Sequence, residues 1–181
     1  PPELIIGKRW KMKNLKRIFI LGTSGSGKTF VGKILSRKLN IPFYDSDDVM
    51  FIKKFTKTRP KEKRKLMLSK IAKKSKWIID GRSSDWSRDP MKKSDLIVWL
   101  QPNIFIRSYR ILKRYYSRKD NSKYQEDLKS LFKLLRYSWS YKWNGRESGF
   151  IKTKKFIEEN KLNPVIIKSN NKLNKFLKEI K

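Results

Sequence analysis

One segment near the N-terminal end restricts the possible folds more than any other. Residues 22–29 read G-T-S-G-S-G-K-T and match the pattern G-x-x-x-x-G-K-[ST] at every defined position. An apolar run at 17–21 precedes the segment, and an amphipathic helical pattern over 28–39 follows it. A strand, a glycine-rich turn and a helix in this order form a loop whose N–H groups bind phosphate. The segment therefore predicts a nucleotide-binding α/β fold.

This loop predicts ATP and Mg²⁺ as cofactors. Its glycines let the backbone curl around the β-phosphate, Lys28 can reach the β- and γ-phosphates, and Thr29 can bind Mg²⁺. A glycine-rich turn that matches by chance is the alternative, but both flanking elements have the required type. The residues predicted to bind the nucleotide are Gly22, Thr23, Ser24, Gly25, Ser26, Gly27, Lys28 and Thr29.

The rest of the chain alternates short apolar runs with helical patterns. The predicted strands lie at 17–21, 41–44, 77–81, 95–100 and 164–167. The predicted helices lie at 28–39, 61–75, 104–117, 125–143, 147–160 and 172–180. Strands that are apolar on both faces and alternate with helices form a parallel sheet covered on each side. The polar stretch 117–125 is predicted to be a loop.

Acidic residues follow two of the predicted strands. Asp45, Asp47 and Asp48 come after the second strand, and Asp80 ends the third. The carboxyl ends of parallel strands face the ligand crevice, so carboxylates there can order Mg²⁺ or hold an acceptor hydroxyl. An apolar run ending in Asp is the Walker-B pattern, which assigns Asp80 to Mg²⁺. For the first group the alternative is helix capping, with Ser46, Asp47 or Asp48 as the N-cap.

Three arginines, Arg107, Arg110 and Arg114, share one face of a predicted helix. A guanidinium group binds phosphate through two hydrogen bonds, so this face is expected to contact a polyphosphate. The chain has 34 Lys and only 13 Arg, which makes arginines at helical spacing more informative than any lysine. The alternative is a helix face that is simply solvated. Arg82, which follows Asp80 and Gly81, is also expected to point toward the crevice.

The predicted helix 125–143 carries aromatic and basic residues together. Leu128, Leu131, Phe132, Leu135 and Trp139 have the spacing of a buried face, with basic residues between them. The favoured interpretation is a helix packed on two sides. The alternative is a surface on which nucleic-acid bases stack.

Composition excludes several kinds of chemistry. The 181 residues include no His and no Cys, which removes disulfides, thiolate nucleophiles, zinc sites and any histidine base. No apolar run approaches the roughly 20 residues that span a bilayer, so we expect a cytoplasmic protein without a membrane segment. The net charge is +31, from 47 Lys and Arg against 16 Asp and Glu. Such a surface attracts polyanions, so nucleic acid is a possible partner.

The motifs together resemble the topology modulation protein family, small P-loop proteins related to adenylate kinases. The similar segments are G-T-S-G-S-G-K-T, I-P-F-Y-D-S-D, W-I-I-D-G, S-D-L-I-V-W-L, R-S-Y-R-I-L-K-R and L-L-R-Y-S-W, between about residues 16 and 180. The resemblance implies a three-layer α/β fold of the nucleoside-monophosphate-kinase type, with a five-stranded parallel sheet of order 2-3-1-4-5. It implies one domain over 16–181, an extension at 1–15 and a short lid region around 115–125.

This sequence differs from the family pattern in two segments, both expected on the side of the site that binds the acceptor. The D-S-D segment at 45–47 looks more like that of shikimate and gluconate kinases, in which one carboxylate lies near Mg²⁺ and the other on the acceptor hydroxyl. Asp80-Gly81 is followed by Arg82-Ser83, where the family tends to have Asn-Tyr.

These observations predict a kinase that transfers the γ-phosphoryl group of ATP to a small acceptor. The residues predicted to act in catalysis are Lys28, Asp47, Asp80, Arg110 and Arg114. The residues predicted at the metal are Thr29, Asp45 and Asp80, and Arg107 is predicted to bind the ATP phosphates. The alternatives are a nucleic-acid-binding protein with a regulatory ATP site, and an assembly partner, for instance of a ribonucleoprotein, without turnover.

Overall fold

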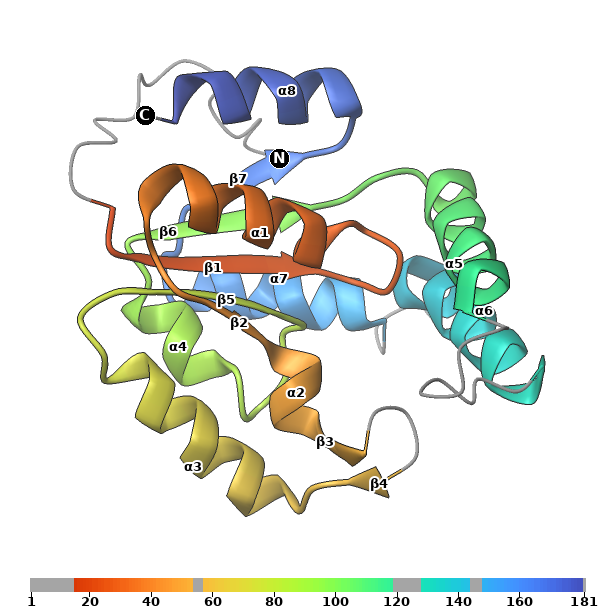
Figure 1. Ribbon diagram of the computed structural model, residues 1–181, viewed down its shortest axis with the longest axis horizontal. Helices are drawn as coiled ribbons and strands as arrows, with labels where there is room; N and C mark the ends of the chain where they lie inside the picture. Colours follow the sequence, from red (N-terminus) through yellow and green to blue (C-terminus); the bar gives the residue numbers. More distant parts are fainter. Residues whose placement is uncertain (1–14, 54–56, 119–127, 144–147, 181) are drawn as a thin grey trace.

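A five-stranded parallel sheet forms the centre of the protein (Figure 1). The computed structural model describes residues 15–53, 57–118, 128–143 and 148–180. The sheet has the order β2-β5-β1-β6-β7, and every neighbouring pair is parallel. The strands are β1 (Arg17–Gly22), β2 (Phe43–Asp45), β5 (Trp77–Gly81), β6 (Leu96–Leu100) and β7 (Val165–Ile167). In terms of the five predicted strands this is the order 2-3-1-4-5, so the predicted fold class is confirmed.

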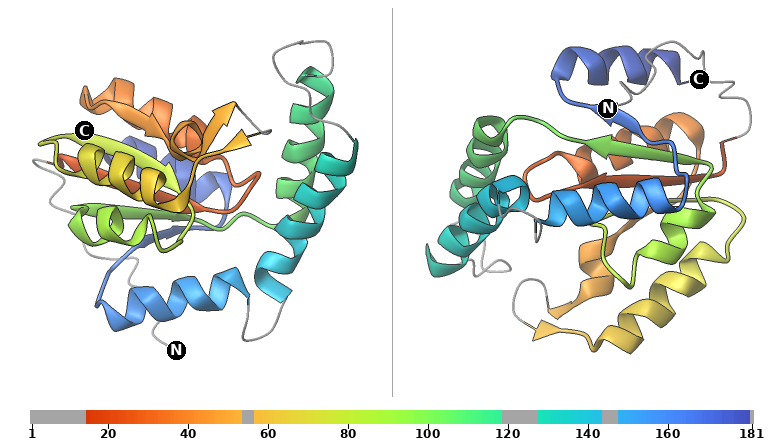
Figure 2. Two further views of the ribbon diagram at one scale, coloured as in Figure 1. Left: turned by 90° about the horizontal axis from the view of Figure 1, so that it is seen from below. Right: turned by 180° about the vertical axis from the view of Figure 1, so that it is seen from behind.

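Helices cover both faces of the sheet (Figures 1 and 2). On β1, Ile18 and Ile20 pack into one layer of the core, while Phe19 and Leu21 pack into the other. The first layer is closed by α1 (Lys28–Leu39) and α8 (Asn170–Glu179). The second layer is closed by α3 (Lys61–Ala72), α4 (Arg88–Lys93) and α7 (Gly149–Glu159). Each strand is therefore apolar on both faces because both faces are buried.

Two helices project beyond the carboxyl edge of the sheet (Figure 2). α5 (Ile104–Arg118) follows β6, and α6 (Leu128–Trp143) packs against it around Ile111, Tyr115 and Leu131. At the same edge, β2 is followed by α2 (Ser46–Met50) and by a small hairpin of β3 (Phe51–Lys53) and β4 (Lys57–Thr58). Among the described helices, none has both the length and the apolar character required to cross a membrane.

Most predicted elements are confirmed, with differences at their ends. The helix after β2 is capped by Asp45, not by Ser46, Asp47 or Asp48, because Asp45 keeps an extended backbone and accepts the N–H of Asp47 at 2.8 Å. The stretch predicted as a loop begins inside α5, which continues through Arg118. The rest of the predicted lid, 119–125, and nearly all of the predicted extension lie outside the described residues. Sequence patterns did not indicate α4 or the β3–β4 hairpin.

α6 packs on two neighbours, α5 and α7, but much of its predicted buried face is exposed. Leu131 is buried, but Leu128, Phe132 and Trp139 have exposed fractions of 60%, 67% and 53%. The expected burial of these three side chains is therefore wrong. Spacing identified a continuous apolar face, but it could not show how much of that face has a partner.

One glycine permits the close approach of α1 to β2. A Cβ atom on Gly32 would lie 2.3 Å from Cε2 of Phe43, a distance that non-bonded carbon atoms do not reach. Because this position carries no side chain, the Phe43 ring packs directly on α1. This contact sets the position of β2, the strand that ends at Asp45.

We expect Gly32→Ala to lower the free energy of unfolding by up to about 2 kcal/mol. Overpacking of about 1–3 kcal/mol outweighs the roughly 1 kcal/mol that alanine gains over glycine in a helix. Denaturant unfolding measures the change, and Lys33→Ala, at an exposed neighbouring position, is the control. In a Phe43→Leu background, Gly32→Ala should become neutral or stabilising. A stabilising effect in the wild-type background would contradict the proposed contact.

Candidate active site at the phosphate loop

The loop 22–29 has the backbone form that phosphate binding requires. Gly25 and Gly27 have φ values of 74° and 94°, in the left-handed region that residues with side chains seldom adopt. Successive N–H groups of such a loop converge on an anion at the start of α1. A Cβ atom on Gly25 would lie 2.5 Å from the carbonyl oxygen of Arg107, so α5 holds this loop closely. The loop geometry therefore fits the phosphate groups of a nucleotide.

Lys28 lies in the loop among carboxylates. Its Nζ donates to the carbonyl oxygen of Thr23 at 3.1 Å. Burial lowers the pKa of Lys28, and the negative charges of Asp80, Asp47 and Asp45 oppose this effect. The ammonium group is thus close to all three acidic residues predicted for the site, and it is positioned to meet an anion at the loop.

Asp80 is the most buried acidic residue of the site, with 1% of its surface exposed. Its Oδ2 accepts a hydrogen bond from Thr29 Oγ1 at 3.0 Å, and its Oδ1 accepts from the backbone N–H of Ser46 at 3.0 Å. Burial raises the pKa of Asp80 to about 6; Lys28 opposes the shift and Asp45 adds to it. The predicted proximity of Thr29 and Asp80 is therefore confirmed by a direct hydrogen bond.

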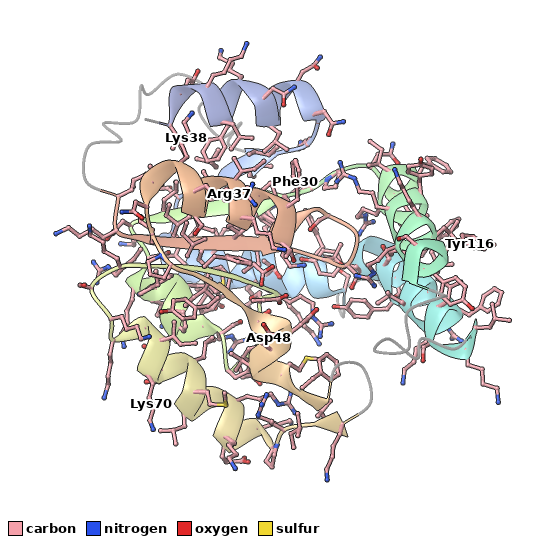
Figure 3. All side chains as sticks on the ribbon, viewed as in Figure 1. Phe30, Arg37, Lys38, Asp48, Lys70 and Tyr116 are labelled. Atoms are coloured by element: carbon pink, nitrogen blue, oxygen red, sulfur yellow. The ribbon has the colours of Figure 1, made fainter. Side chains whose placement is uncertain are left out.

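The other carboxylates lie at the end of β2, next to Asp80. Asp45 and Asp80 are paired residues of neighbouring strands. Asp45 caps α2 through one oxygen, and Asp47 is in the first turn of that helix. Asp48 is exposed on α2, as Figure 3 shows. Within the described ranges no three acidic side chains form a metal-binding cluster. The donor set of Thr29 and a carboxylate suits Mg²⁺, which usually takes its other ligands from phosphate and water.

The three predicted arginines have different surroundings. Arg110 Nη1 donates to the carbonyl oxygen of Ser26 at 3.1 Å, and Nη2 donates to Asn170 Oδ1 at 3.3 Å. Arg114 lies one turn further along α5 and is half-buried. Arg107 is buried, with 5% exposed, and its electrostatic neighbour is Tyr141 of α6. The shared helical face therefore brings the Arg110 side chain to Ser26 of the loop, whereas the Arg107 side chain lies beside Thr23 and Tyr141.

Arg82 follows the end of β5 and lies near Lys28. It is electrostatically coupled to Lys28, and its guanidinium group lies over the Tyr137 ring at 5.0 Å from the ring centre. Sequence reasoning missed Tyr137, which lies beside Arg82, and Asn170, which lies beside Arg110. Asn170 had a signal, because it follows the fifth strand at the carboxyl edge of the sheet. Tyr137 had none, because its position depends on how α6 packs.

The sheet order and the loop after the central strand define the P-loop kinase fold. Residues 18–129 match the AAA domain family, and the chain belongs to that family.

Individual proteins are similar to parts of this chain. The chain is 35% identical to the uncharacterized protein YqaC of Bacillus subtilis (strain 168) over 118 residues, 61% of this chain and 66% of that protein. It is 54% identical to the shikimate kinase of Azobacteroides pseudotrichonymphae over 39 residues, 22% of each chain. The matches thus span less than two thirds of these curated relatives.

A solved structure shows the same fold. The shikimate kinase from Acinetobacter baumannii in complex with shikimate aligns over 93% of this chain and 92% of that chain. The TM-score is 0.57 and the sequence identity is 18%, so the similarity is one of fold.

The buried carboxyl of Asp80 predicts a pH-dependent stability. Between the ordinary pKa of 3.8 and about 6, the folded protein holds a proton here that the unfolded chain has lost, so the free energy of unfolding falls as pH rises through this window. The Asp80→Asn variant has no carboxyl group to titrate at this position, so its free energy of unfolding does not fall for this reason. The free energy of unfolding of the variant minus that of wild type should therefore rise by about 2 kcal/mol from pH 4 to pH 7.

Urea unfolding of the nucleotide-free protein at several pH values measures this difference. Comparing the variant with wild type at each pH cancels the general repulsion among the other charges. The control is Asp85→Asn, at an exposed side chain, which should follow the wild-type curve. If the difference between Asp80→Asn and wild type were the same at pH 4 and pH 7, the folded-state pKa of Asp80 would not be raised.

Proposed function

We propose that this protein is an ATP-dependent kinase that phosphorylates a hydroxyl group of a small metabolite. The observation that carries the proposal is the cluster formed by Lys28, Thr29 and Asp80, with Asp45 and Asp47 beside it. Phosphoryl transfer depends mainly on positioning and on neutralising charge, and it needs neither His nor Cys. The cluster supplies the groups for both tasks.

In this proposal the nucleotide phosphates bind at the loop 22–29. Lys28 would leave the Thr23 carbonyl oxygen and neutralise the transferred phosphoryl group, as a P-loop lysine does. Mg²⁺ would be held by Thr29 and ordered by Asp80 and Asp45, and it would neutralise charge between the phosphates. Arg110 already contacts the loop at Ser26, so it and Arg114 would add positive charge on the side of α5.

The acceptor would lie beside β2 and β5. Asp47 would accept the hydroxyl proton or orient that group, and Arg82 offers a cation to an acidic acceptor. The D-S-D segment and the shikimate kinase relatives support a hydroxylated metabolite as the acceptor. The resemblance to topology modulation proteins supports a nucleotide instead, so both classes belong in the test.

Incubation with Mg-ATP and a panel of acceptors tests the proposal. The panel contains shikimate, gluconate, nucleosides and nucleoside monophosphates, and the readout is release of ADP together with the mass of the phosphorylated product. We expect one class to accelerate ADP release, and Lys28→Ala to reduce that rate at least about 100-fold with the fold intact. Lys33→Ala, at an exposed position on the same helix, should retain the rate.

Two results would argue against the kinase. ADP release that no acceptor accelerates would remove the support for phosphoryl transfer to a metabolite. An acceptor-dependent rate that survives in Lys28→Ala would place the active centre outside the phosphate loop. Circular dichroism of Lys28→Ala separates loss of activity from loss of fold.

A second candidate function, binding of single-stranded nucleic acid, is supported by the surface of α5 and α6. The two helices carry nine Lys and Arg residues, five on α5 and four on α6, and no acidic residue. Tyr109 and Tyr116 are 64% and 66% exposed on α5, and Phe132 is 67% exposed on α6. Figure 3 shows Tyr116 on the outer side of α5. Exposed aromatic rings among cations can stack bases and hold phosphates.

We expect labelled polyuridylate to bind at physiological salt if this surface is used. Replacing both Tyr109 and Tyr116 by Ala should weaken binding at least about fivefold, since base stacking contributes about 1–3 kcal/mol per base. Fluorescence anisotropy measures the affinity, and Phe30→Ala, which removes an exposed ring from α1, is the control (Figure 3). Binding that disappears as salt is raised and ignores the tyrosines would be charge attraction alone.

A further inference from the structure

A cavity of about 470 Å³ lies where β6, α5, α6 and α7 meet. Its wall includes Gln101–Asn103 after β6, the first turn of α5, Tyr141 of α6 and Phe150 of α7. Figure 2 shows α7 running from the sheet toward α6 at this corner. The carboxylates of the proposed active site lie at the ends of β2 and β5, strands that do not contribute to the cavity. The volume is typical of sites that bind small organic molecules.

The wall of this cavity is largely aromatic and aliphatic. Phe150 packs against Trp99 with ring centres 5.3 Å apart, and against Tyr141 with ring centres 6.4 Å apart. The apolar part also includes Leu100, Pro102, Ile104 and Phe105. An apolar body would lose its contact with water here, which favours binding.

The polar part of the cavity is cationic. Arg107 is 5% exposed, and its Nε has no hydrogen-bond partner among the residues that the structure describes. Within the same residues no acidic side chain forms an ion pair with it, and none lines the cavity. The hydroxyl of Thr23, 3% exposed, also lacks a hydrogen-bond partner within the described part of the chain. Lys168 is exposed at the same cavity.

A buried guanidinium group without a counter-ion is unfavourable, because burial removes its hydration without supplying an opposite full charge. An anionic group placed beside it would restore the lost interactions, and guanidinium matches carboxylate and phosphate with two parallel hydrogen bonds.

We propose that this cavity is a second ligand site, which binds an organic anion composed of an apolar body and one carboxylate or phosphate group. The anionic group pairs with Arg107 and accepts a hydrogen bond from Thr23. The apolar body packs between Ile104, Tyr141 and Phe150. The site is separate from the place where Arg110 meets the phosphate loop, although α5 contributes to both.

Naphthoate and its neutral analogue naphthalenemethanol are suitable probes, since they share a body and differ in charge. Titration of the unmodified 181-residue chain, followed by NMR, gives the affinity and the residues that respond. We expect naphthoate to shift signals of Ile104 and Phe150, and to bind at least about fivefold more tightly than the alcohol. Arg107→Gln should weaken naphthoate binding about tenfold or more, as expected for a lost hydrogen-bonded charge. Arg37→Gln, which removes an exposed arginine from α1, should bind like wild type.

Three results would contradict the proposal of a second ligand site. Equal affinity for naphthoate and the alcohol would show that Arg107 does not select an anion, and this comparison needs no variant. Shifts confined to residues outside the cavity would place the probe on another surface. Strictly competitive displacement of naphthoate by Mg-ATP would show that Arg107 belongs to the nucleotide site, as its spacing in the sequence predicts.

Discussion

The hydrogen bond between Thr29 and Asp80 joins the two halves of the candidate active site. It can form only because β1 and β5 are neighbours in parallel register, with Ile20 opposite Asp80. The register brings the end of β5 level with the loop that follows β1. The carboxylate is buried, and Lys28, the Thr29 hydroxyl and the Ser46 N–H offset the loss of its hydration. The phosphate loop and the residues proposed to hold the metal and the acceptor are therefore held together by one pairing of strands.

The large positive charge has little part in this arrangement. The site itself contains several carboxylates close to Lys28, so its local charge is far more balanced than that of the whole chain. Many basic side chains lie elsewhere; Arg37 and Lys38 are on α1 and Lys70 is on α3, at different sides of the molecule (Figure 3). Such a surface raises the encounter rate with any polyanion, but it selects none of them. In the second proposed function, selectivity would come from the aromatic residues that accompany the charge on α5 and α6.

The elements of the fold could be predicted because their signals are local. Strands that are buried on both faces read as short apolar runs, and the loop motif lies between a strand and a helix as its chemistry requires. The partners of each helix face could not be predicted, since they depend on packing between distant segments. Spacing placed Arg107 and Arg110 on one face of α5, yet Arg110 meets Ser26 and Asn170 while Arg107 is enclosed near Tyr141. Spacing also assigned Trp139 to a buried face, because it does not show which part of a helix face has a packing partner. Trp139 is in fact 53% exposed.

Helix α5 connects the phosphate loop with the cavity at Arg107. The carbonyl oxygen of Arg107 lies so close to Gly25 that no side chain fits between them, and one turn later Arg110 donates to Ser26. A displacement of α5 by an occupant of the cavity would alter both contacts, and with them the shape of the loop. If the two sites are coupled in this way, each ligand must change the affinity of the other by the same factor. The close contact at Gly25 is thus the physical basis on which the second site would regulate the first.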